Sequence, residues 1–434
     1  MGRRVAWWVP AVNGLMRPAT RRARRGPGAS FGALQERAAA RSGVPEPADP
    51  RFVADLRVLH TEFLSVPELS FIGLASGRSE LLRHLGNWLS VREYLRAQPQ
   101  VAEVPMLRPV FVVGLPRTGT TLLHALLASV PGHRAARMWE LLAPVPASAG
   151  QPHPGQPVRD AERLAKQAHL AAPSLRVIHP VDACAPEECV FAMPHSMVYH
   201  VRARIPGYRD WYAGRDATAD YVYLRQQLQI LQWQRPAHRW ILKSPFHLWN
   251  LDALLRVFPD ATIVWTHRDP AVALASWCSF VEIPMTLSNR RVDRPLLGRD
   301  WAQMWAQANA RGTKRAPARR CRSLTSPIRS SALTRSPCST KFCAASAPPW
   351  DRKRATRRSP ERDGARVACI TTALTATASA RARSATPSPT TSDKSPLPGE
   401  GIIRYGRCGG HRPRGRMIGD RPGGSSGTGT AGDR

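Results

Sequence analysis

One stretch, residues 109–124, constrains the fold of this chain more than any other part of the sequence. It reads PVFVVGLPRTGTTLLH, and the apolar, β-branched run at 110–113 predicts a buried strand. The apolar residues from 122 to 130 predict a helix directly afterwards. The loop between them contains two glycines, and such a loop directs backbone N–H groups and the positive end of the helix dipole at one spot. We therefore expect this loop to bind an anion.

The charge in this loop is placed differently from that of an ordinary nucleotide-binding loop. The spacing of Gly114 and Gly119 matches the P-loop of kinases and ATPases, in which a lysine follows the second glycine. Here Thr120 follows it, and the positive charge lies before it, at Arg117. The loop therefore predicts anion binding by a guanidinium group. A P-loop kinase or ATPase that uses Arg117 in place of the lysine is the alternative.

The net charge of +32 invites a nucleic-acid-binding interpretation, but the charge is concentrated at the two ends of the chain. Residues 1–41 carry a net charge of +8 and residues 311–434 carry +19, whereas residues 42–310 carry only +5. Non-specific, salt-sensitive binding of nucleic acid through the ends is therefore the non-enzymatic alternative. We expect no specific nucleic-acid partner.

Cysteine spacing and hydropathy point to a cytoplasmic protein. None of the eight cysteines belongs to paired Cys-x-x-Cys motifs, so neither a zinc site nor a disulfide framework is predicted. No apolar run approaches the roughly 20 residues that a transmembrane helix needs. The start, residues 1–9, resembles the basic and apolar beginning of a signal peptide, but Pro10 and Asn13 interrupt it. A solvated extension and a start codon assigned too early are the preferred explanations.

Composition and periodicity divide the chain into four regions. They are a basic extension predicted to be disordered (1–45), a helical N-terminal region (46–108), an α/β domain (109–310) and a basic low-complexity tail (311–434). In the second region the apolar spacing predicts helices at about 51–65 and 77–97.

The third region alternates between strands and helices. Further strands are predicted at 240–242 and 262–265, and further helices at about 157–171, 217–234, 248–258, 271–280 and 301–309. This order predicts a P-loop-type three-layer α/β fold, with a central parallel sheet between helices. Ligands bind at the carboxyl ends of such strands. The three strand ends carry Arg117, Lys243 and Arg268.

The sequence changes character after residue 310. The tail has three aromatic residues and no apolar run of strand or helix period, and its start interrupts the helical pattern at 301–309. A natural disordered tail is one interpretation. We favour a shift of reading frame near residue 311, because the change is abrupt and five cysteines are scattered through the tail.

Three motifs together resemble one enzyme family. The loop at 116–121, Pro-Arg-Thr-Gly-Thr-Thr, is similar to the 5′-phosphosulfate loop of sulfotransferases that use 3′-phosphoadenosine 5′-phosphosulfate (PAPS). Arg268 and Ser276, eight residues apart, match the pair that binds the 3′-phosphate in that family. The segment 242–245, Leu-Lys-Ser-Pro, resembles the lysine motif of tyrosylprotein-type sulfotransferases. The resemblance covers residues 45–310 and is strongest to the large bacterial sulfotransferase family.

The resemblance implies transfer of a sulfuryl group from PAPS to a hydroxyl or amine, without a metal. The 5′-phosphosulfate would be bound by the loop residues Arg117, Thr118, Gly119, Thr120 and Thr121. Lys243 would stabilise the leaving oxygen, and Arg268 and Ser276 would bind the 3′-phosphate. The acceptor would be a small molecule, a lipid or a glycan. The oligomeric state is left open.

The general base is assigned by position only. Related tyrosylprotein enzymes place a catalytic glutamate at a similar point after the loop helix, which implies Glu140 here. Glu187, Glu188 and His179 are the alternatives. A carboxylate base works best near neutral pH if burial raises its pKa. Relatives continue with further α/β elements beyond residue 310, so we expect a chain without them to be unstable or inactive.

Overall fold

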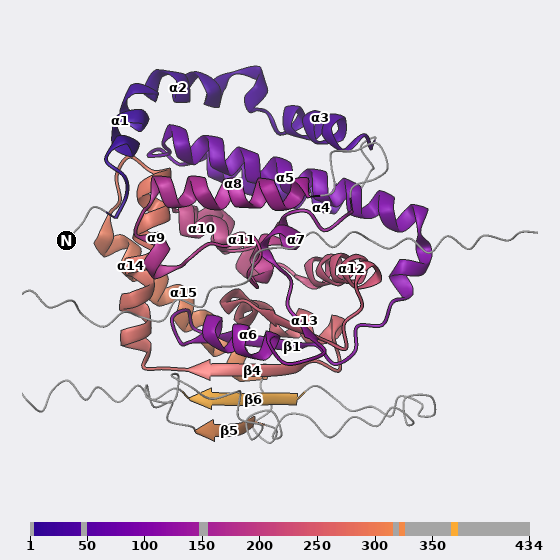
Figure 1. Cartoon of the computed structure of the whole chain (residues 1–434). Helices are drawn as coiled ribbons and strands as arrows, with labels where there is room; N and C mark the ends of the chain where they lie inside the picture. The colour runs from indigo at the N-terminus through magenta and orange to yellow at the C-terminus, as the bar shows by residue number, and fades with distance from the viewer. Residues whose placement is uncertain (1–3, 45–49, 147–154, 316–320, 326–365, 372–434) are drawn as a thin grey trace, which may run out of the picture.

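The computed structural model describes residues 4–44, 50–146, 155–315, 321–325 and 366–371. Most of the tail, including 326–365 and 372–434, lies outside the described residues. The prediction that the tail is disordered therefore concerns residues that the structure does not describe. Within the described part, helices form most of the molecule and one sheet lies at its edge (Figure 1).

The sheet has six strands in the order β2-β3-β1-β4-β6-β5. The strands are β1 (Val110–Gly114), β2 (His133–Arg134), β3 (Arg239–Lys243), β4 (Thr262–His267), β5 (Cys321–Thr325) and β6 (Arg366–Thr371). Every pairing is parallel, and Val110 lies opposite both Ile241 and Thr262. The parallel sheet predicted from the sequence is therefore confirmed, although its strands β4, β6 and β5 lie at the edge of the molecule.

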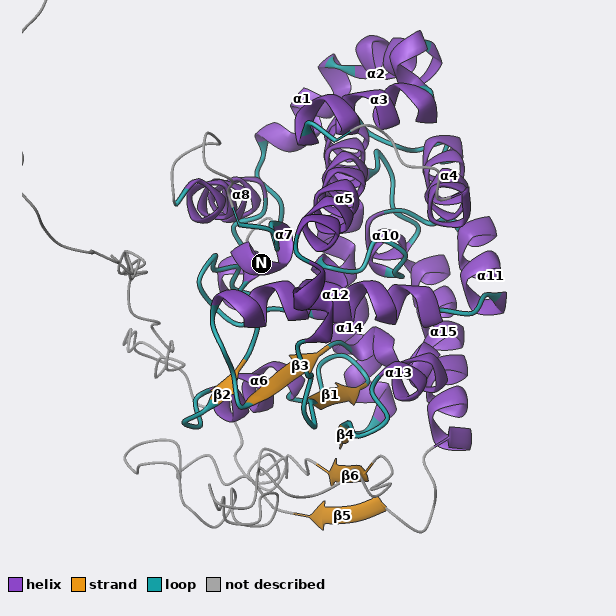
Figure 2. Ribbon diagram, turned by 90° about the vertical axis from the view of Figure 1, so that its right-hand side faces the viewer, coloured by secondary structure: helices purple, strands orange, loops and turns teal. Residues whose placement is uncertain are grey.

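The apolar character of β1 determines its central place. All five of its residues are buried, which is typical of a parallel strand covered on both faces. The ring of Phe111 packs at 5.2 Å from Phe258 and edge-on to His247 at 5.3 Å. Helix α6 (Thr120–Ala128) lies on one side of β1 and β3, and α13 (Leu251–Val257) lies on the other (Figure 2).

The predicted helices of the middle of the chain are present, but those predicted at 77–97, 271–280 and 301–309 extend further than predicted. The remaining helices from α4 onward are α4 (Pro50–Ser65), α5 (Phe71–Ala97), α7 (Met138–Leu142), α8 (Gln156–Ala171), α9 (Leu175–Ile178), α10 (Val198–Arg202), α11 (Pro206–Gly214), α12 (Thr218–Gln234), α14 (Pro270–Ser288) and α15 (Arg294–Arg315). The helix predicted at 248–258 is instead a 3₁₀ turn, Pro245–Asn250, followed by α13. Ser244 caps that turn by accepting the N–H of Phe246.

The prediction of a disordered extension at 1–45 is wrong for its described residues. They form α1 (Trp8–Leu15), α2 (Arg17–Arg25) and α3 (Phe31–Ser42). Phe31 and Leu34 on α3 are buried in the main core, against α5. The arginine-rich composition concealed a few apolar residues whose burial holds these helices on the molecule.

The boundary predicted at residue 310 is also wrong. Helix α15 continues to Arg315, and β5 and β6 extend the sheet beyond β4. Strands of five and six residues give too short a pattern to be recognised in an arginine-rich sequence. These strands are stabilised by pairing with the open edge of β4, and the local strand propensity of the sequence does not indicate such a distant contact.

We predict that Leu34→Ala destabilises the whole α/β domain. Leu34 is 1% exposed, so its truncation leaves a cavity that costs about 2–5 kcal/mol of the free energy of unfolding. Urea denaturation measures this free energy. Leu107→Ala, at a position that is 61% exposed, should change it by less than about 0.5 kcal/mol. Equal stability of the two variants would show that α3 does not belong to the core.

Candidate functional site

The loop after β1 depends on glycines at two positions. Gly114 has φ of +142°, and a Cβ on it would lie 2.5 Å from the carbonyl oxygen of Thr266. Only glycine therefore lets β1 and β4 approach at their carboxyl ends. Gly119 has φ of +87° and directly precedes the first turn of α6, whose backbone N–H groups face the loop.

Arg117 adopts a backbone conformation that non-glycine residues rarely adopt, with φ of +66°. Two contacts hold it there. Arg268 Nη1 donates a hydrogen bond of 2.9 Å to the carbonyl oxygen of Arg117, and Arg117 Nε donates one of 3.1 Å to Ser276 Oγ. Strain of this kind persists where the surrounding structure enforces it, commonly at functional sites. The structure thus brings Arg117, Arg268 and Ser276 together.

These two guanidinium groups form a candidate anion site. In the part of the chain that the structure describes, neither Arg117 nor Arg268 pairs with a carboxylate; their partners are carbonyl oxygens and one hydroxyl. Burial, and then the positive charge of Arg268, lower the pKa of Arg117. Two half-buried like charges held side by side favour binding of an anion between them.

The threonines of the loop have different roles. Thr118 Oγ1 donates to the carbonyl oxygen of Leu115 at 2.6 Å and lies 2.7 Å from Thr266 Oγ1, so it ties the loop to β4. Thr120 is buried at the start of α6, whereas Thr121 is exposed beside Lys243. Of the three hydroxyls, that of Thr121 is the most accessible to a ligand.

Lys243 lies at the carboxyl end of β3 and is 1% exposed. Its Nζ donates a hydrogen bond of 2.5 Å to Glu188 Oε1 and one of 3.4 Å to Thr121 Oγ1. Lys243 therefore joins the start of α6 to the segment that carries Glu188. The same charge, after burial, helps to lower the pKa of the neighbouring His124 to about 3.

Glu140 is held in a different network. Its Oε1 accepts a hydrogen bond of 2.6 Å from Arg134, and its Oε2 accepts the N–H of Arg137 at 2.8 Å. Arg134 also donates to the carbonyl oxygen of Leu231 at the end of α12. Glu140 is 2% exposed and caps α7, so this arrangement gives it a structural role.

The alternative bases are also placed. Glu187 accepts the N–H of Glu188 at 2.9 Å and lies 4.0 Å from His179, whose ring packs edge-on to Phe280. Glu188 is the one of these that contacts Lys243. Its adjacency to Glu187 was visible in the sequence, but the fold alone shows which carboxylate faces β3.

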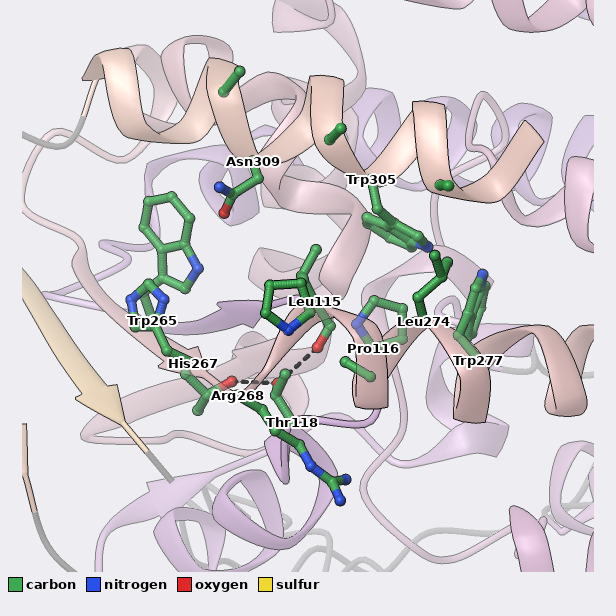
Figure 3. Close-up of a pocket in the computed structure, with 16 residues that line it drawn as sticks. Leu115, Pro116, Thr118, Trp265, His267, Arg268, Leu274, Trp277, Trp305 and Asn309 are labelled. Carbon is green, nitrogen blue, oxygen red and sulfur yellow. Dashed lines mark hydrogen bonds between the residues drawn. The ribbon is translucent and has the colours of Figure 1, made fainter. Parts of the chain in front are cut away.

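An apolar pocket of about 420 Å³ lies behind the loop, between β4, α14 and α15. Trp265, Trp277 and Trp305 line it, and the Arg268 guanidinium points away from their rings (Figure 3). The dashed bonds of Thr118 in that view tie the loop to β4 at the edge of the pocket. The walls of the pocket come from three distant segments, so local sequence patterns did not show which side chains line it together.

Two further findings bear on chemistry and location. Among the described residues, no group of three or more His, Cys, Asp or Glu side chains could hold a metal ion. In the same part of the chain, α14 is the helix whose length and apolar composition would suffice to cross a bilayer. A third of that span, 33%, is buried in the structure, and Trp277 and Val281 belong to the main core.

Comparison with known proteins identifies the class. The description "Sulfotransferase family" matches residues 109–324. Sulfotransferase STF1 from Mycobacterium tuberculosis superposes with a TM-score of 0.58 and 29% identity, over 66% of this chain and 80% of that one. Sulfotransferase STF9 from Mycobacterium avium gives a TM-score of 0.59 and 27% identity, over 65% and 74%. Through residues 109–324, the chain belongs to the sulfotransferase family.

The curated relatives align with a smaller share of this chain than the solved structures do. The omega-hydroxy-beta-dihydromenaquinone-9 sulfotransferases Stf3 of Mycobacterium bovis and Mycobacterium tuberculosis are 29% identical over 212 residues. That alignment covers 44% of this chain and 49% of theirs, so the chain spans about half the length of these relatives.

We predict that Glu140→Gln lowers stability without abolishing nucleotide binding. The substitution leaves the buried guanidinium of Arg134 without its carboxylate, which costs about 3–5 kcal/mol of the free energy of unfolding. Chemical denaturation and calorimetric titration with adenosine 3′,5′-bisphosphate measure the two quantities. Unchanged stability would contradict the structural role of Glu140.

Proposed function

We propose that this protein transfers a sulfuryl group from PAPS to the hydroxyl group of an acceptor. The observation that carries the proposal is the meeting of Arg117, Arg268 and Ser276 at the loop, with no carboxylate partner for either guanidinium among the described residues. Such a site suits a ligand with two separate phosphate-type groups, and the family assignment supports the same reaction.

The residues present fit such a donor. Arg117 and the N–H groups at the start of α6 would hold the 5′-phosphosulfate, with Thr121 beside them. Arg268 and Ser276 would hold the 3′-phosphate, a group that ATP lacks. The family does not favour the alternative of a P-loop kinase or ATPase, and Thr120 stands where such an enzyme has its lysine.

The chemistry requires charge neutralisation and removal of one proton. The donor would supply an activated sulfur atom. The bond between this sulfur and the bridging phosphate oxygen would break as the acceptor oxygen forms a bond to the sulfur. Lys243 offsets the negative charge on the departing oxygen, because its ammonium group lies beside Thr121 at the loop. Glu188 accepts the proton of the acceptor hydroxyl, since it is the carboxylate in contact with Lys243. We prefer it to Glu140 for this reason.

The acceptor is proposed to be a lipid or another apolar molecule that carries a hydroxyl group. The Stf3 relatives are named for a hydroxylated menaquinone derivative. The apolar lining of the pocket behind the loop shows that this fold leaves apolar surface near the site. Sugars and phenols are the competing acceptors.

We predict that Arg117→Ala and Arg268→Ala each weaken binding of adenosine 3′,5′-bisphosphate by about tenfold to a hundredfold. Each substitution removes a charged hydrogen bond worth about 1.5–3 kcal/mol. Isothermal titration without magnesium measures the affinity. Arg176→Ala, an exposed arginine in the neighbouring α9, serves as the control and should bind as the unaltered protein does. Tighter binding of magnesium-ATP than of the bisphosphate would overturn the proposal.

We predict that Lys243→Met and Glu188→Gln each lower the rate of sulfuryl transfer by about a hundredfold or more, with bisphosphate affinity nearly unchanged. Transfer of radiolabelled sulfuryl from PAPS to a panel of hydroxylated lipids, sugars and phenols measures the rate and the acceptor class. Glu187→Gln is the matched control and should retain activity. Full activity of Glu188→Gln, or labelling of sugars alone, would refute the assigned base or the assigned acceptor.

A further inference from the structure

Helix α1 presents one continuous uncharged face to solvent. Trp7 is 71% exposed and Leu15 is 80% exposed, at the two ends of the helix. Between them Pro10, Ala11 and Gly14 are exposed as well. Positions 7, 10, 11, 14 and 15 share one side of a helix, so the face is a stripe. Large apolar side chains on such a stripe point to an interaction.

The opposite face fixes the orientation of α1. Val9 is fully buried against Ala172 and Ile283. The side chain of Asn13 accepts the N–H of Ile72 at 3.2 Å and donates to the carbonyl oxygen of Leu287. Because these contacts anchor α1 to α5 and α14, its apolar stripe stays directed outward.

Helix α2, which follows directly, is strongly basic. Arg17, Arg21, Arg22 and Arg25 are exposed, and the described residues 4–35 contain no acidic residue. Among the residues that the structure describes, none of these four arginines forms an ion pair with a carboxylate. Burial, and then the charges of Arg290 and Arg25, lower the pKa of Arg24.

A groove at the same place gathers this charge. It has a volume of about 410 Å³ and is lined by Arg17, Arg21, Arg24, Arg25 and Arg290, among others. Guanidinium groups in this arrangement match phosphate oxygens, which accept their paired hydrogen bonds.

We propose that α1 and α2 together dock on the surface of an anionic lipid bilayer. The stripe of α1 would enter the interfacial region, and the arginines of α2 and its groove would bind the lipid phosphates. An apolar face with an exposed tryptophan beside a run of arginines is the pattern of an interfacial helix. The surface lies at the end of the molecule opposite the outer strands β6 and β5 (Figure 1).

The charge and the apolar stripe of this surface disfavour three other binding partners: the tail of this chain, a second copy of the chain and nucleic acid. The tail 311–434 carries a net +19, so it is repelled by α2. A second copy of the same surface would place arginines against arginines. Nucleic acid would satisfy the arginines but would leave Trp7 and Leu15 exposed.

Docking there would bring the bilayer close to the donor site. Helix α14 runs from the end of β4 to α1 (Figure 1), and Ile283, which packs on Val9, lies seven residues after Ser276. That separation is about 10 Å along the helix axis. This consequence for a lipid acceptor rests on the proposed function, whereas bilayer binding itself does not.

The test is flotation of the full chain with vesicles of phosphatidylglycerol and phosphatidylcholine, compared with phosphatidylcholine alone. The variant R21A/R22A/R25A should weaken partition to the anionic vesicles by about a hundredfold, at about fivefold for each arginine. The variant W7A/L15A should weaken it by about a hundredfold, at about tenfold for each side chain. Both should leave the melting temperature and the bisphosphate affinity unchanged, since these side chains are exposed.

Matched controls remove the contribution of overall charge and of exposed apolar residues elsewhere. R96A/R159A/R256A has the same net charge, and L107A/W233A has the same exposed residue types. Equal partition of test and control variants would overturn the proposal. So would a change of oligomeric state in W7A/L15A, or loss of DNA-duplex binding in R21A/R22A/R25A with vesicle binding intact. Displacement from vesicles by inorganic phosphate alone would likewise contradict bilayer docking.

Discussion

The hydrogen bond from Arg268 to the carbonyl oxygen of Arg117 connects the two halves of the site. It joins the end of β4 to the loop after β1, and it holds Arg117 in its left-handed conformation. Two positive side chains approach each other here although their charges repel. Gly114 makes this approach sterically possible, because it lets β1 and β4 converge. The geometry of the anion site is therefore set by backbone contacts, before any ligand binds.

The buried strands position the charged residues that lie at their carboxyl ends. The apolar residues of β1 place the strand ends together, and each end then delivers one cation: Arg117, Lys243 or Arg268. Lys243 differs from the arginines because Glu188 already neutralises it. The site thus combines two guanidiniums without acidic partners in the described structure and one ion pair whose lysine is buried.

The sequence predicted which strand-end residues lie together, and it missed the helices at the N-terminus. Strand ends and loop spacing located Arg117, Arg268 and Lys243, because a parallel sheet converts these positions into neighbours. Glu140 was chosen by position along the chain, and a buried pairing with Arg134 then gave it another role. The N-terminal helices were missed because five arginines in α2 outweigh the few apolar residues of α1 and α3 in any local average. Burial of Val9 and Leu34 depends on distant segments that no window includes.

The pairing of β6 with β4 has a consequence for biosynthesis. Thr262 lies opposite Arg366, about a hundred residues later, so the ribosome finishes β4 long before its partner emerges. During that interval the outer edge of β4 offers unpaired backbone groups to any extended chain nearby. Contacts of such long sequence separation also form slowly. The nascent protein therefore passes through a stage in which chaperone capture or premature aggregation competes with completion of the sheet.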